Sequence, residues 1–406
     1  MSSSLIKSTG TNLDDILEMN RSLVVRTIKR KKNCSRAELA VITGLKQASI
    51  TKIIAALIEL GIVCETGLVS GARGRRSIGL ALNDTMYQVV GLKMARKSFS
   101  IGLYDISGNE YCYQTEALDI RKEPEIAFAR MKEAVAKLVA ESNRVVAIGI
   151  AIPGPYLKQQ GRIALVTEFP GWNNINFLKE FEECFNIPVY IEHDANAGAL
   201  AEWWFGPYSR ESGVMVHILA SEGIGAGIIV DGRLLSGSQG IAGEIGHMSI
   251  DINGKPCECG SYGCLEQYCS AIALQKNTIE ALKNASDNPL NRFSELTPEI
   301  IIYEAHSGNP LAGQMLKQVA DYIGYGIVNI VNLYNPDIIV ISDILAKGGD
   351  ILLSRINSVV QKRVLPAVYA NLSIELSKFA NDPILYGAAA IAINQFLSAP
   401  TAFTVR

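Results

Sequence analysis

A cluster of cysteines behind a histidine restricts one part of the fold before any secondary structure is assigned. Cys257, Cys259, Cys264 and Cys269 fall within 13 residues, and His247 lies ten residues before the first of them. The chain has no uncharged apolar run of about 18 residues and no apolar stretch near its start. We therefore expect no signal peptide, no membrane insertion and a cytoplasmic location. In that compartment cysteines stay reduced, so a cluster of this kind indicates a metal site.

The spacing within the cluster selects the ligands. One histidine and three cysteines within 18 residues suit tetrahedral zinc, and the Cys-x-Cys pair can bind through a tight turn. Gly260 and Gly263 let the backbone fold around an ion, whereas no glycine would bring Cys269 round to it. The alternative is a set of reduced, buried cysteines beside a core histidine. We predict a structural zinc ion whose ligands are His247, Cys257, Cys259 and Cys264.

Charge is distributed unevenly along the chain. Residues 1–82 contain 13 Lys and Arg against 6 Asp and Glu, a net charge of +7, while the whole chain has a net charge of −2. A basic head on an acidic body indicates that the head meets a polyanion and that the body does not. With 406 residues, 48% hydrophobic and 19% charged, the chain has room for two or three globular domains.

The basic head carries the local signals of three helices and a strand pair. Ser35 and Glu38 have the spacing of a capping box at the start of a helix, and Gly44 can take positive φ in the following turn. Between the two strands lies a glycine-rich basic loop, residues 70–76. The spacing predicts helices over residues 13–32, 35–42 and 47–60 and strands over 62–65 and 77–82.

This order of elements is typical of a winged helix-turn-helix, in which a recognition helix reads DNA from its N-terminal end. The alternative is a helical hairpin for protein contacts with a solvated charged loop. We expect Gln47, Ser49 and Lys52 near the major groove, and the loop arginines on phosphates or in the minor groove. The full set expected at DNA is Ser35, Arg36, Lys46, Gln47, Ser49, Lys52, Arg73, Arg75 and Arg76.

Beyond residue 83 strands and helices alternate, which predicts an α/β protein with mixed sheets and two lobes around a cleft. Strands are expected over 87–92, 98–104, 145–150, 189–191, 213–219 and 227–230, and helices over 123–143, 177–184 and about 310–333.

Several motifs together resemble the ROK family of repressors, uncharacterised reading frames and sugar kinases, and especially its NagC-, Mlc- and XylR-like repressors. They are Gly74-Arg75-Arg76, Pro153-Gly154, Glu192-His-Asp-Ala-Asn196, Gly243-Glu-Ile-Gly-His247 and the run Cys257-Glu-Cys-Gly-Ser-Tyr-Gly-Cys264-Leu-Glu266. The resemblance covers nearly the whole chain. It implies an α/β fold with an N-terminal winged helix-turn-helix followed by a two-lobed actin-like (ribonuclease H-like ATPase) sugar-kinase fold. The expected domains are 1–82, a small lobe 83–192 completed by a C-terminal helix 386–406, and a large lobe 193–385 with the zinc site and sugar pocket.

The resemblance also implies a sugar pocket. Asp194, Glu244, His247 and Glu266 would hold sugar hydroxyls, since several hydroxyls buried together need a ring of polar partners. Zinc would fix the turn that carries Glu266 and orient His247. Gly154 and His193 complete the expected site, and His193 stands where the kinases usually carry asparagine.

Three departures argue against kinase activity, although Asp194 occupies the position of the family's general base. The first phosphate-binding turn is replaced by Lys93-Met-Ala-Arg-Lys97, which has no glycine. The second, residues 220–227, keeps its glycines but has Glu222 in place of threonine, and Ser342-Asp343 replaces a pair of glycines on the nucleotide side. The remaining glycines are better explained as a tight strand turn. The basic residues of the first turn could bind a sugar phosphate or serve as structural charges.

These observations predict a sugar-responsive repressor rather than an enzyme. A homodimer, or a dimer of dimers, would bind pseudo-palindromic operator DNA and release it when a sugar or sugar phosphate closes the lobes. Two rivals are a repressor sequestered by a sugar-transport protein and an active sugar kinase that carries a DNA-binding head. The identity of the sugar does not follow from these residues.

Overall fold

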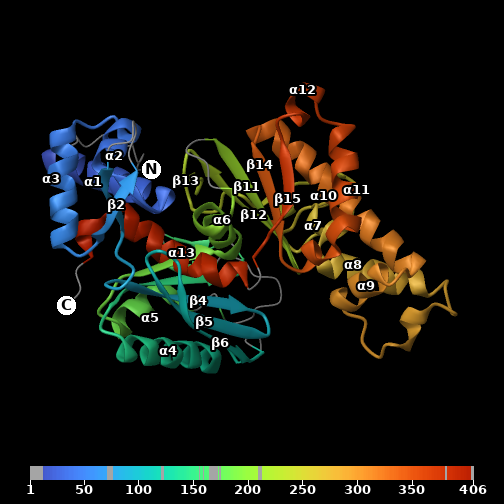
Figure 1. Cartoon of the computed structure of the whole chain (residues 1–406). Helices are drawn as coiled ribbons and strands as arrows, with labels where there is room; N and C mark the ends of the chain where they lie inside the picture. Colours follow the sequence, from blue (N-terminus) through green and yellow to red (C-terminus); the bar gives the residue numbers. More distant parts are fainter. Residues whose placement is uncertain are drawn as a thin grey trace, which may run out of the picture.

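The computed structural model describes residues 12–70, 76–119, 123–154, 156–158, 160–163, 172, 175–208, 213–379 and 382–403. Figure 1 shows a helical head, a first lobe with a five-stranded sheet and a second lobe with another five-stranded sheet. A C-terminal helix, α13, passes between these parts.

The head is built from three helices and a small sheet of order β1-β3-β2. The predicted capping box is confirmed: Ser35 Oγ accepts from the Glu38 amide at 3.3 Å, and Glu38 Oε2 accepts from the Ser35 amide at 2.7 Å. Gly44 ends the second helix with φ of +70°, and the chain turns by 118° into the third helix. The elements are α1 (Leu13–Lys31), β1 (Cys34–Ser35), α2 (Arg36–Thr43), α3 (Gln47–Glu59), β2 (Val63–Ser70) and β3 (Arg76–Leu82).

Strand β2 runs five residues past its predicted end. The register of β2 against β3 shifts between Glu65 and Leu68, where Gly67 has φ of +93°. Gly67 therefore lies at a bulge inside this strand. Arg73 and Arg75, predicted at DNA, lie outside the described residues.

The first lobe has a sheet of order β10-β7-β4-β5-β6. β4, β5 and β6 are antiparallel neighbours, while β7 and β10 run parallel to β4. Aromatic residues of α4 and α5, including Phe128, Phe177 and Phe181, are buried against one face. The elements are β4 (Gln88–Ala95), β5 (Ser98–Asp105), β6 (Glu110–Ala117), α4 (Pro124–Glu141), β7 (Val145–Ile152), β8 (Tyr156–Leu157), β9 (Arg162–Ile163), α5 (Phe177–Cys184) and β10 (Val189–His193).

The second lobe has a sheet of order β13-β12-β11-β14-β15, with α6 on one face and a layer of longer helices on the other. The sheet elements are β11 (Val214–Ala220), β12 (Ile224–Val230), β13 (Arg233–Leu234), β14 (Ile338–Ser342) and β15 (Ser373–Leu376). The helices are α6 (Asp194–Phe205), α7 (Glu266–Cys269), α8 (Ala271–Leu282), α9 (Pro298–His306), α10 (Pro310–Tyr334), α11 (Gly349–Gln361) and α12 (Pro366–Tyr369).

Helix α13 (Pro383–Ser398) differs from the predicted C-terminal helix in length and in position. It begins three residues earlier, because the Asp382 side chain accepts hydrogen bonds from the Ile384 and Leu385 amides and Pro383 occupies the first turn. It ends at Ser398 and is followed by a short 3-10 turn. It packs on β4 and β7 of the first lobe and also on α6 of the second, so it contacts both lobes.

The head is joined to the body through α1. Ser22 Oγ donates to Leu397 O at 2.7 Å, and the Arg26 guanidinium donates to Asn394 Oδ1 at 3.1 Å, so α1 lies against the end of α13. Lys29 Nζ donates to the carbonyl oxygens of Ile106 and Ser107, which precede β6. Burial lowers the pKa of Lys29 to about 7.

Among the described residues no single helix meets the length and hydropathy needed to cross a membrane, and only the sharply bent pair α2 and α3 does so when taken together.

Candidate metal centre and interlobe cleft

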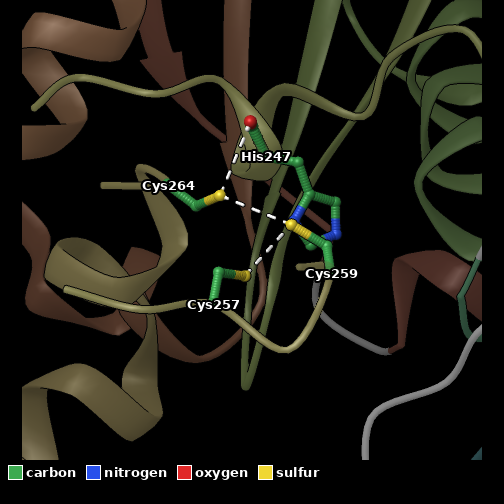
Figure 2. Close-up of side chains that lie close together, drawn as sticks. All are labelled: His247, Cys257, Cys259 and Cys264. Atoms are coloured by element: carbon green, nitrogen blue, oxygen red, sulfur yellow. Dashed lines mark hydrogen bonds between the residues drawn. The ribbon is translucent and has the colours of Figure 1, made fainter. Parts of the chain in front are cut away.

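The four predicted zinc ligands meet at one point (Figure 2). Their ligand atoms all lie within 4.8 Å of one another. The Cys259 and Cys264 sulfurs are 3.6 Å apart, and Cys257 Sγ lies 3.7 Å from His247 Nδ1. With zinc–sulfur bonds of about 2.3 Å, a tetrahedral site has edges of roughly 3.8 Å, so the donor set and its spacing fit zinc. The predicted grouping is confirmed, and zinc as its occupant stays a prediction.

The loop that carries the cysteines is shaped by close backbone contacts. Two bridges, Ser249 with Cys264 and Pro256 with Tyr262, fold it back on itself. Gly263 has φ of +69°, and a Cβ there would lie 1.7 Å from the Asp251 carbonyl oxygen, so no other residue fits. The remaining cysteine of the cluster, Cys269, is buried on α7 and donates to Leu265 O, outside the ligand group.

All six residues predicted to bind sugar line one cleft between the lobes. Gly154 follows β7, while His193 and Asp194 lie at the junction of β10 and α6. The others come from the second lobe: Glu244 and His247 flank a short 3-10 turn, and Glu266 begins α7. Segments far apart in sequence therefore supply one pocket.

The cleft holds a buried, charged cluster around His193. Its Nε2 lies 3.0 Å from Asp194 Oδ1 and its Nδ1 lies 3.7 Å from Glu244 Oε1. Burial alone would lower the pKa of His193, but Asp194 and then Glu244 outweigh it and raise this pKa to about 9. The side chain is therefore an imidazolium at neutral pH.

Burial raises the pKa of Glu244, and its Oε1 is buried with no hydrogen-bond partner. A buried acceptor of this kind needs a donor to offset its desolvation.

The metal centre and the cleft share side chains. His247 turns Nδ1 toward Cys257 and also lines the cleft, which leaves Nε2 available there. Glu266, two residues after Cys264, accepts a hydrogen bond from the Ile224 amide at 2.9 Å through Oε2. A metal that fixes Cys264 and His247 would therefore also fix two walls of the cleft.

Ion pairs occupy the part of the cleft formed by the turns after β4 and between β11 and β12, where the resemblance implies phosphate-binding turns in kinases. Lys93 Nζ lies 2.6 Å from Asp382 Oδ2, and Arg96 Nε lies 2.9 Å from Glu222 Oε2 across the two lobes. Asp343 has φ of +72°, in the region that favours glycine. Lys93 and Arg96 are therefore both ion-paired, which favours structural charges, the second of the two interpretations of this turn. The pairing of Asp382 with Lys93 was not predicted from the sequence. The only local signal is Pro383, which is typical of the first turn of a helix and would make Asp382 its cap.

The glycines of the second turn are explained by packing. The turn joins β11 to β12, and the Ser221 amide donates to Gly223 O at 3.0 Å. A Cβ at Gly227 would lie 2.5 Å from both the Ala195 carbonyl oxygen and the Ala199 Cβ of α6. Glycine is thus required where β12 crosses α6, which supports the prediction of a tight strand turn.

The head presents most of the predicted DNA-contacting side chains to solvent. Lys46, Gln47 and Lys52 are exposed at the start of α3, Ser49 is half-buried, and Arg76 is exposed on β3. Arg36 is paired with Glu65 at 2.8 Å. Ser35 has to be corrected: it is 2% exposed and its hydroxyl caps α2, so it is a capping residue and not available to DNA.

Comparison with known proteins places these features in a family. The model of the ROK family matches residues 89–395, which make up most of the chain. The chain belongs to the ROK family. A curated relative, the xylose repressor of Caldicellulosiruptor bescii, is 31% identical over 94% of this chain and 97% of its own.

Solved structures agree in fold. A ROK family transcriptional regulator described as a homologue of the Escherichia coli Mlc protein matches with a TM-score of 0.81, 30% identity and coverage of 95% of this chain and 97% of its own. A ROK glucokinase from Streptomyces griseus matches with a TM-score of 0.65 and 24% identity, covering 75% of this chain and 99% of its own. The mixed α/β fold of the body is thus shared with both regulators and sugar kinases, while a quarter of this chain has no counterpart in that kinase.

Proposed function

We propose that this protein is a DNA-binding transcriptional repressor of carbohydrate genes, released from its operator by a sugar bound in the cleft. The observation that carries the proposal is that one helix, α13, connects the cleft to the head. Its first turn lies at the cleft, where Ile384 is part of the lining, and its last turn contacts α1. The named repressor relatives, alignable over nearly their whole length, support the same function.

The DNA-binding part is a winged helix-turn-helix. The turn of 118° between α2 and α3 falls in the range of helix-turn-helix units, and the exposed polar residues lie at the start of α3, as expected of a recognition helix. We assign base reading to Gln47, Ser49 and Lys52, and phosphate contact to Arg36, Lys46 and Arg76. A dimer would place two such helices in successive major grooves.

The effector is a sugar, or a sugar phosphate whose phosphate group projects out of the cleft. Asp194, Glu244, Glu266 and His247 offer acceptors and a ring nitrogen to hydroxyls. Glu244 Oε1, which accepts no hydrogen bond, is the clearest acceptor for a sugar hydroxyl. Zinc has a structural role here: it would hold His247 and the turn before Glu266 in place.

Coupling between the two sites follows from the position of α13. A helix of 16 residues is about 24 Å long and moves as a rigid body. Closure of the lobes on a sugar would shift α13 and, through Ser22 and Arg26, α1. By linkage, operator DNA must weaken sugar binding by the same factor that sugar weakens DNA binding.

An active kinase is the weaker alternative. Asp194 is present, but the ion pairs of Lys93 and Arg96 fill the place of the phosphate turns. ATP should neither stabilise the protein nor be consumed with any sugar. Thermal unfolding against a panel of sugars, sugar 6-phosphates and ATP tests this directly, since a ligand at 100 times its Kd adds about 2.7 kcal/mol. A shift with ATP would overturn the repressor proposal.

Release of DNA by a membrane fraction and by no sugar would favour control by a transport protein.

Replacing Glu244 by Gln should weaken the sugar found in that panel by about 10-fold to 100-fold, because it removes a charge-assisted hydrogen bond worth roughly 1.5–3 kcal/mol. Isothermal titration calorimetry measures the loss. Glu299→Gln, on the exposed surface of α9, is the matched control and should bind sugar as the wild type does. Equal affinity in both variants would remove Glu244 from the site.

Replacing Lys52 by Ala should weaken operator binding by about 1–3 kcal/mol, while sugar affinity stays unchanged. The operator can be selected from genomic fragments with the wild-type protein, and affinities compared by fluorescence anisotropy. Lys276→Ala removes the same charge from the exposed side of α8 and should have no effect. If both variants bind DNA equally well, α3 is not the reading helix.

A further inference from the structure

A second cavity lies where the head, both lobes and α13 meet. It is lined by α1, by Lys158 and Glu192 of the first lobe, by the turn between β12 and β13 of the second lobe, and by the end of α13. None of its lining residues belongs to the sugar cleft. It is therefore a separate space at the junction between the body and the head.

The charges around this cavity are predominantly positive. Three arginines line it, Arg26 and Arg30 from α1 and Arg233 from β13. Within the described part of the chain, none of the three forms an ion pair with a carboxylate. The two acidic residues of the lining are otherwise engaged: Glu192 is paired with Lys158, and Asp231 accepts a hydrogen bond from the Gly213 amide. Burial, followed by the charges of Arg30 and Arg233, lowers the pKa of Arg26 to about 10.

One of these arginines, Arg26, is also held in position by its neighbours. The Arg26 guanidinium donates to Asn394 Oδ1 and to Ser398 Oγ, at 3.1 and 2.6 Å, and lies 5.3 Å from the centre of the Trp204 ring. Arg30 follows one turn later on α1, on the same side of the helix. Three guanidinium groups gathered without acidic partners repel one another, and a dianion among them would remove that cost. Guanidinium groups match phosphate oxygens in charge and in geometry.

We propose that this cavity binds the phosphate group of a small phosphorylated metabolite, with Arg30 and Arg233 as its principal ligands beside Arg26. The bound phosphate links α1 of the head to β13 of the second lobe and restrains the head in the orientation seen here. The site is distinct from the sugar cleft and does not depend on the function of that cleft.

The test uses the full-length zinc-loaded protein with two probes, inorganic phosphate and glucose 6-phosphate. Calorimetry should show saturable binding of at least one probe, weakened about 10-fold to 100-fold in Arg233→Gln and in Arg30→Gln. Arg130→Gln, on the outer side of α4, is the matched control and should bind as the wild type does. Arg26 is not replaced, since it fastens α1 to α13. Hydrogen exchange of the α1 amides should slow on addition of the probe in the wild type but not in Arg233→Gln.

Each outcome separates this site from the cleft. Binding of glucose 6-phosphate alone identifies a phosphorylated metabolite as the ligand class, whereas equal binding of both probes shows that phosphate alone suffices. Loss of binding in Arg96→Gln with full binding in Arg30→Gln and Arg233→Gln would place the anion in the cleft and overturn the proposal. Absence of saturable binding to the wild type would overturn it as well. Circular dichroism of each variant confirms that a loss is not caused by unfolding.

Discussion

Removal of the metal should lower the thermal midpoint of this protein by roughly 10–20 °C and abolish sugar binding. Structural zinc contributes about 10–16 kcal/mol of apparent binding free energy in small zinc domains. Here the bridges of Ser249 with Cys264 and of Pro256 with Tyr262 already fold the loop back on itself, so we expect about 5 kcal/mol of that to appear as stability. At roughly 2–4 °C per kcal/mol, this gives the stated shift. Calorimetry before and after chelation, with zinc content by mass spectrometry, measures it.

Two cysteine variants make this prediction specific. Cys264→Ser removes a fully buried ligand and should yield protein with little zinc, a low midpoint and no sugar binding. Cys269→Ser alters an equally buried cysteine only five residues away, outside the ligand group, and should keep one zinc per chain. If the two variants carried the same amount of zinc, the ligand assignment would be wrong. Loss of zinc with unchanged sugar binding would contradict the role given to His247 and Glu266.

The parts of this protein that were predictable from sequence are those determined by nearby residues or by strong chemical constraint. The capping box of Ser35 and Glu38 is local, because both partners lie within one turn. The ligand group is constrained by the coordination of zinc, which few residue sets satisfy. The residues that line the cleft were predictable only through resemblance to a family, since Gly154, His193 and Glu244 come from three separate segments.

What could not be predicted depends on contacts between distant segments. Lys93 and Asp382 are 289 residues apart, and no local pattern indicates that they pair. The same holds for Arg96 with Glu222 across the lobes, and for α13, whose apolar sequence shows burial but not its neighbours. Strand β6 was missed because it is a largely exposed edge strand, so its side chains lack the alternation of a half-buried one. Ser35 was predicted both as a helix cap and as a DNA contact, and its buried hydroxyl fits only the first of these roles.

Replacing Glu202 by Gln should remove the contribution of this carboxyl group to the pH dependence of stability between about pH 4.5 and pH 7. Glu202 is fully buried on α6, and the neighbouring Ser377 hydroxyl offsets only part of the cost of burying its charge. Burial raises its pKa from 4.5 to about 7, so the folded state retains a proton that the unfolded state releases. Through this group the wild type therefore loses about 3 kcal/mol of stability as the pH rises from about 4.5 to about 7, at 1.36 kcal/mol per pKa unit, and little more above that range. The buried His217, whose pKa is lowered to about 4, acts in the opposite direction over this range in both proteins, so the difference between them reports Glu202. Glutamine has the same shape and no charge. The free energy of unfolding of the variant should therefore match that of the wild type at pH 4.5 and exceed it by about 3 kcal/mol at pH 8.

Thermal unfolding at these two pH values measures the difference, with Glu295→Gln as an exposed control. Parallel pH profiles for Glu202→Gln and the wild type would show that water or a neighbouring group stabilises the charged carboxylate in the folded protein.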